Sequence, residues 1–71
     1  MKGKIINREV VTVGPDVDLV SDYVRRGYVV RVLADDTSRR AMERLRGSLK
    51  RRLKSGVTIR ALAGSFFISK T

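Results

Sequence analysis

The sequence contains no cysteine, no histidine and no tryptophan, and it has a single proline. Without cysteine there is no disulfide framework and no thiolate-ligated metal site. Without histidine or cysteine, neither a Ser-His-Asp nor a Cys-His catalytic set can be assembled. No glycine-rich phosphate loop precedes a helix-like segment either. We therefore expect a protein that is not an enzyme and that uses no cofactor, no metal and no small-molecule substrate.

Long apolar runs are also missing from the chain. No stretch approaches the roughly 20 apolar residues that span a bilayer, and the start, MKGKIINREV, lacks the apolar core of a signal peptide. These features predict a cytoplasmic protein that does not enter a membrane. The 71 residues suffice for one domain with a thin core. A bound partner or a second copy would therefore add stability.

Acidic residues are scarce in the second half of the chain. Residues 1–37 hold six bases and six acids, whereas residues 38–71 hold ten bases and only one acid, Glu43. The formal net charge of +9 therefore arises from the second half. A localised basic surface attracts polyanions and releases their counterions on binding. Nucleic acid is the commonest partner of this kind.

Most of these bases belong to residues 38–54, SRRAMERLRGSLKRRLK, where apolar residues recur at helical spacing. On a helical wheel, one sector about 120° wide holds Ala41, Met42, Leu45, Leu49 and Leu53. One flank carries Arg40, Arg44 and Arg51, and the back carries Arg39, Arg46, Lys50 and Lys54. The pattern predicts an amphipathic helix with one apolar stripe and a basic remainder.

A solvated surface helix is the alternative interpretation of this segment. Such helices usually mix charge signs at i,i+4 spacing, whereas here only Glu43 offers an acid within a turn of the bases. A glycine inside a helix costs about 1 kcal/mol relative to alanine. Gly47 among the bases therefore marks either a close approach of a phosphate or a packing or drift position.

The remaining segments predict strands and one short helix. Residues 4–13 indicate either one strand with an irregular start, which we favour, or a small hairpin that bends at residues 7–9. Residues 28–33 indicate a buried central strand in which Arg31 is the one polar interruption. Residues 16–26 predict a helix that ends at Gly27. The acids and hydroxyls of residues 35–38 favour capping of the basic helix over a metal site, and Gly56 is expected in the left-handed position after that helix.

Residues 57–71 predict a β-hairpin that turns at Ala63 and Gly64. We favour the register that sets Ala61 opposite Phe66, because it places five apolar residues on the core face: Val57, Ile59, Ala61, Phe66 and Ile68. A type I turn with Gly64 in a bulge would instead turn Phe67 inward. The order is then β-α-β-α-β-β, an α+β domain over residues 1–71 with two helices packed on one face of the sheet.

The pattern RRAMERLRGSLKRRLKSG followed by VTIRALAGSFFISK resembles small basic proteins of phages and other mobile elements. In those proteins an Arg-rich helix runs into a terminal β-hairpin, and DNA binding is presumed. The element order also resembles the Alba-type chromatin fold, in which helix bases and a projecting basic hairpin hold nucleic acid. This chain departs from that family because its first helix is short and its hairpin tip, residues 62–65, carries no base.

These observations favour a nucleic-acid-binding protein that grips phosphates with little sequence preference. The candidate contacts are the helix bases Arg39, Arg40, Arg44, Arg46, Lys50 and Arg51, with Arg60 and Phe67 on the hairpin. DNA is slightly favoured over RNA, because only Phe67 is a clear exposed aromatic. Arg60 and Phe67 could equally form a cross-strand cation–π pair without a ligand. The alternative function is protein interaction, either docking on an acidic protein or forming a homodimer through the hairpin edge.

Overall fold

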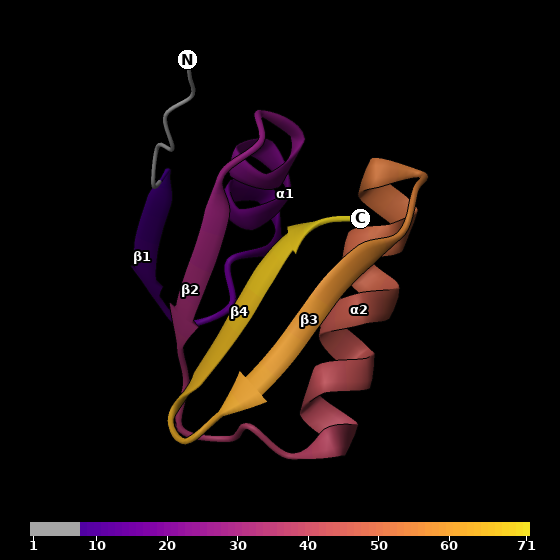
Figure 1. Cartoon of the computed structure of the whole chain (residues 1–71). Coiled ribbons are helices and arrows are strands. Elements are labelled where there is room, and N and C mark those ends of the chain that lie inside the picture. Colours follow the sequence, from indigo (N-terminus) through magenta and orange to yellow (C-terminus); the bar gives the residue numbers. More distant parts are fainter. Residues whose placement is uncertain (1–7) are drawn as a thin grey trace.

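The computed structural model describes residues 8–71, which contain two helices and four strands. The elements in chain order are β1 (Glu9–Val13), α1 (Val17–Arg25), β2 (Val29–Leu33), α2 (Arg39–Leu53), β3 (Val57–Leu62) and β4 (Ser65–Lys70). The sheet has the order β1-β2-β4-β3, with β1 parallel to β2 and the other neighbours antiparallel. Both helices lie on one face of the sheet, behind it in Figure 1. The predicted α+β architecture is confirmed.

The first strand begins later than the sequence pattern suggests. It starts at Glu9, which lies opposite Val29, and it ends at Val13 opposite Leu33. Residues 4–7 of the predicted strand lie outside the described residues. None of the helices in residues 8–71 has the length and apolar character needed to cross a membrane.

Helix α1 has the predicted ends. The Asp16 side chain accepts a hydrogen bond from the backbone N–H of Leu19 at 3.2 Å and so caps the first turn. Gly27 follows the helix with φ of 93°, a conformation that glycine adopts without a Cβ clash. Val20 and Val24 are fully buried between these ends, so this short helix contributes one apolar face to the core.

Helix α2 begins as predicted but ends differently. The Ser38 hydroxyl accepts a hydrogen bond from the Ala41 N–H at 3.3 Å. At the other end, Lys54 takes the left-handed conformation, with φ of 57°, and its N–H donates to the Lys50 carbonyl at 2.8 Å. The expectation that Gly56 would hold this position is therefore wrong. Gly56 instead lies beside Thr71, whose Oγ1 would be 3.4 Å from an added Cβ.

The core fills the space between the helices and the inner face of the sheet. Its buried residues are Val20 and Val24 of α1, Leu45 and Leu49 of α2, and Val30, Val32, Ile59, Phe66 and Ile68 of the strands. The central strand β2 is buried on this face only, because nothing in residues 8–71 covers the other face. Val29 is 38% exposed, so the prediction of a buried strand is wrong at this position, whereas the exposed Arg31 is the one polar residue of the pattern.

The hairpin has the favoured register. Ala61 pairs with Phe66, Ile59 pairs with Ile68, and Phe66 is only 2% exposed. Gly64 supplies the positive φ of the turn, at 75°. Ala61 nevertheless remains exposed, because β3 diverges from α2 toward the turn (Figure 1). Its expected contribution to the core is therefore absent.

Candidate nucleic-acid interface

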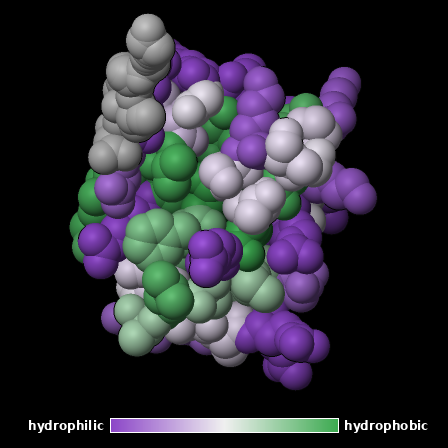
Figure 2. All heavy atoms as spheres, viewed as in Figure 1, coloured by the Kyte–Doolittle hydropathy of each residue, from purple (hydrophilic) through white to green (hydrophobic). Residues whose placement is uncertain are grey.

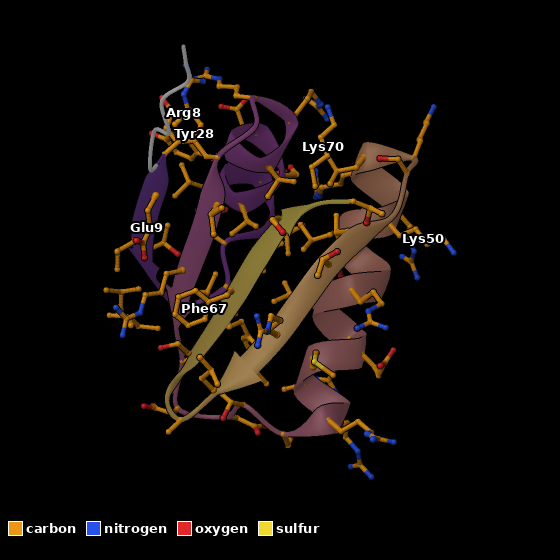
Figure 3. The ribbon with its side chains drawn as sticks, in the orientation of Figure 1. Arg8, Glu9, Tyr28, Lys50, Phe67 and Lys70 are labelled. Carbon is orange, nitrogen blue, oxygen red and sulfur yellow. The ribbon has the colours of Figure 1, made fainter. Side chains whose placement is uncertain are left out.

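The exposed side of α2 carries a set of bases that form no ion pair within residues 8–71. We call this set the α2 basic surface, and it comprises Arg39, Arg40, Arg44, Lys50, Arg51 and Lys54, all exposed. The ion pairs found in residues 8–71 involve other bases, namely Arg26, Arg46 and Arg52. Figure 3 shows Lys50 projecting from α2 away from the sheet. The apolar stripe of α2 faces the core, so this side remains free for a ligand.

Arg46 differs from the other predicted contacts on α2. Its Nη1 lies 3.6 Å from Oε2 of Glu43, one turn earlier on the helix. The Nε of Arg46 is buried without a hydrogen-bond partner in the described structure. Arg46 is half-buried and already shares its charge with Glu43, so it is less available to a phosphate than its neighbours.

Arg52 has a structural role that the sequence pattern did not reveal. Its Nη1 forms an ion pair with Oδ1 of Asp18 on α1. The guanidinium of Arg25, also on α1, donates a hydrogen bond to the backbone carbonyl of Arg52 at 3.4 Å. These two contacts join the helices side by side. Both contacts are exposed, so the orientation of α2 depends mainly on the burial of Leu45 and Leu49 in the core.

Arg60 and Phe67 are separated from the helix bases by the thickness of the domain. They pair across β3 and β4, at positions that alternate with the buried Ile59 and Ile68, and so lie on the face away from the helices. The cation over the Phe67 ring is Arg31 of β2, whose guanidinium carbon is 5.4 Å from the ring centroid. The structure thus brings Phe67 together with Arg31 and not with the helix bases.

The face of the sheet away from the helices is open and largely apolar. Figure 2 shows this face, with hydrophobic residues gathered over β1, β2 and β4. Val11 is 54% exposed, Val13 is 86% exposed and Leu62 is 54% exposed. Phe67 lies in the middle of this face in Figure 3. The strands contribute three charged side chains to it, those of Glu9, Arg31 and Arg60.

A groove of about 870 Å³ opens at the end of the sheet where the parallel strands β1 and β2 finish. Its inner surface includes the core residues Leu45 and Phe66 together with Val17, Ala34 and Ala41, which pack against the core. Its charged lining residues are Arg40 and Arg44 of the α2 basic surface and Asp35 and Asp36 of the loop before α2. Two of the predicted nucleic-acid contacts therefore line a cavity that the sequence pattern did not indicate.

The predicted capping of α2 is made by Ser38, and Asp36 supports this cap from the preceding loop. Its Oδ1 accepts a hydrogen bond from the Ser38 N–H at 3.0 Å. Hydrogen bonds from the Ser38 backbone and side chain, with a smaller effect of the Arg44 charge, hold the pKa of Asp36 below its ordinary value. Within residues 8–71 no three Asp, Glu, His or Cys side chains are grouped so that they could hold a metal ion.

Compared with models of protein families, with curated proteins and with solved structures, the chain matches none of them. Its function therefore has to be inferred from its own geometry.

Proposed function

We propose that this protein is a non-enzymatic nucleic-acid-binding protein that holds phosphates on the α2 basic surface. The observation that carries the proposal is the exposure of these bases without acidic partners in residues 8–71. Like charges so close together repel one another and weaken the helix. A polyanion that docks on α2 relieves this repulsion, and the counterions condensed on the polyanion are released at the same time.

Phosphate contacts carry no sequence information, so binding is sequence-tolerant and strongly salt-dependent. DNA is the favoured polymer. RNA-binding sheets usually expose several aromatic rings, whereas the open face here presents Phe67 with Arg31 already over it. For this role we expect the protein in the cytoplasm, associated with the nucleoid.

The test is the salt dependence of binding to a mixed-sequence DNA duplex, followed by fluorescence anisotropy. The slope of log affinity against log salt is about −0.9 per phosphate neutralised, so three contacts lose about 40-fold between 50 and 200 mM salt. Replacing Arg39, Lys50 and Arg51 together by Gln keeps helix propensity similar. This variant should flatten the slope by up to about 2.7.

The matched control replaces Arg8, Arg25 and Arg26 by Gln, which removes the same charge from exposed positions off α2. This control should bind nearly as well as the wild type, and circular dichroism should show that both variants are folded. Equal weakening by the two triple replacements would mean diffuse charge attraction without a site on α2. Unchanged binding in both would count against nucleic acid as the partner of this surface.

A second candidate function, self-association, is favoured by the exposed valines and leucine of the open sheet face. The occupant that fits best is a second copy of the chain. The strands give this face few charges, so two copies can meet there while their basic helices stay on opposite outer sides. Sedimentation equilibrium tests this candidate. A wild-type dimer, together with monomeric Val11→Lys and Leu62→Lys variants, would support it.

A further inference from the structure

The groove beside α2 lies outside the carboxyl ends of β1 and β2, the parallel pair of this mixed sheet. Its lining includes Val13 and Leu33, the last residues of β1 and β2, and the loops that follow them. The volume of about 870 Å³ is within the range of small-ligand pockets.

The inner part of the groove is apolar, so it suits a ligand with a flat, apolar face. Leu45 and Phe66 line the groove but are only 5% and 2% exposed. The accessible apolar surface therefore comes mainly from Val13, Val17, Leu33 and Ala41. An unpaired nucleobase that leaves the stack finds such an environment between apolar side chains.

The charges of the groove come in two pairs of opposite sign. Arg40 and Arg44 on α2 suit a phosphate, because guanidinium groups bind phosphate oxygens with paired hydrogen bonds. The carboxylates of Asp35 and Asp36 only accept hydrogen bonds. Among the nucleobases, guanine is the one whose Watson–Crick edge offers two adjacent N–H donors, and these match one carboxylate. Neither arginine is within ion-pair distance of an acid in residues 8–71.

We propose that the groove binds one unpaired guanine nucleotide of a nucleic-acid strand. The base lies against the apolar inner surface with its Watson–Crick edge at Asp35, because Asp36 already accepts hydrogen bonds from Ser38, and its phosphate lies on Arg40 and Arg44. This inference rests on the proposed function, because Arg40 and Arg44 also belong to the α2 basic surface and connect the groove to the bound backbone. A guanine inside a duplex has its edge paired, so the groove selects single strands or frayed ends.

The experiment compares affinities at one salt concentration for a short oligothymidine strand, the same strand with one central guanine, and the same strand with one central adenine. Bidentate recognition of a base is worth about 1–3 kcal/mol. The guanine strand should therefore bind roughly 5- to 150-fold more tightly than the other two. Equal affinity for the three strands would overturn the proposal.

Two neighbouring positions on α2 provide matched variants. Ser48 is half-buried and lines the groove, whereas a side chain at Gly47 would meet nothing within 4 Å. Ser48→Leu should narrow the groove and weaken the guanine preference, while Gly47→Leu should retain it. A guanine preference that is the same in Ser48→Leu as in the wild type would place the recognition elsewhere and overturn the proposal.

A second variant is designed to keep the fold and to change only the carboxylates of the groove, of which Asp35 faces the Watson–Crick edge of the base. Asp35→Asn combined with Asp36→Asn preserves an oxygen acceptor for the Ser38 N–H and should remove the guanine preference. The remaining outcomes separate the two proposals. If every strand and the duplex bind equally with a steep salt slope, the phosphate-binding function stands and the groove inference fails. If no nucleic acid binds, the proposed function itself fails.

Discussion

The guanidinium group of Arg31 lies over the ring of Phe67, with 5.4 Å between its central carbon and the ring centroid. The two residues pair across β2 and β4, and the Nε of Arg31 also donates to the Ser65 hydroxyl at 3.5 Å. Arg60 pairs with Phe67 from the opposite side, on β3. Phe67 thus has a cation from each neighbouring strand, and the one on β2 covers its ring.

A double-mutant cycle should detect this pair. Arg31→Gln and Phe67→Leu, measured singly and together by urea unfolding, should give a coupling free energy of about 0.5–1 kcal/mol. The matched cycle uses Arg60→Gln with Phe67→Leu and should give a smaller coupling. A larger coupling for Arg60 would show that the ring is covered from β3 in solution.

The apolar stripe of α2 supports the whole domain. Leu49 is fully buried, whereas Leu62 is 54% exposed. Leu49→Ala should lower the free energy of unfolding by about 2–5 kcal/mol, because it leaves a cavity in a thin core. Leu62→Ala should change it by less than about 0.5 kcal/mol. Leu49→Asp should unfold the domain, since it buries an unpaired charge, and a folded Leu49→Asp protein would contradict the described core.

The end of α2 offers a test of backbone strain. Lys54 has φ of 57°, where a side chain costs about 1 kcal/mol that glycine avoids. Lys54→Gly should therefore raise the free energy of unfolding by up to that amount. Arg51→Gly, inside the last turn, should lower it by about 1 kcal/mol. If Lys54→Gly destabilises the protein as much as Arg51→Gly does, the helix continues through position 54.

The local elements were predictable because their signals are local. The stripe that includes Leu45 and Leu49, the cap residues Asp16 and Ser38, and the favoured hairpin register all depend on residues close in the chain. Gly56 was a wrong choice for the left-handed position because Lys54 occupies it despite its Cβ. Propensity gives the preference of a residue type and cannot tell which of two nearby residues ends a helix.

The candidate site was only partly predictable, because it depends on which strands are neighbours. The order β1-β2-β4-β3 places β2 beside β4, and this gives Phe67 its contact with Arg31. The favoured hairpin register, in contrast, already predicted that Arg60 and Phe67 lie on the face away from the core. The groove that includes Arg40 and Asp36 arises where two loops and α2 meet, and no single segment carries its signal.

The fall in the free energy of unfolding at acid pH should depend in part on Asp36. Its pKa is lower in the folded protein than the ordinary 3.8, chiefly because its carboxylate accepts the Ser38 backbone hydrogen bond. The folded state therefore binds this proton less readily than the unfolded state. The resulting stabilisation is complete well above pH 3.8 and is lost as the pH falls through the lower folded pKa.

Asp36→Asn keeps an oxygen acceptor but does not titrate, so its free energy of unfolding should fall less steeply than that of the wild type below pH 3.8. Asp35→Asn is the matched control, because it removes the same charge from the neighbouring exposed position, and it should follow the wild-type curve. Identical falls in this free energy for the wild type and Asp36→Asn, measured by urea unfolding at a series of pH values, would show that the Ser38 hydrogen bond does not persist in solution.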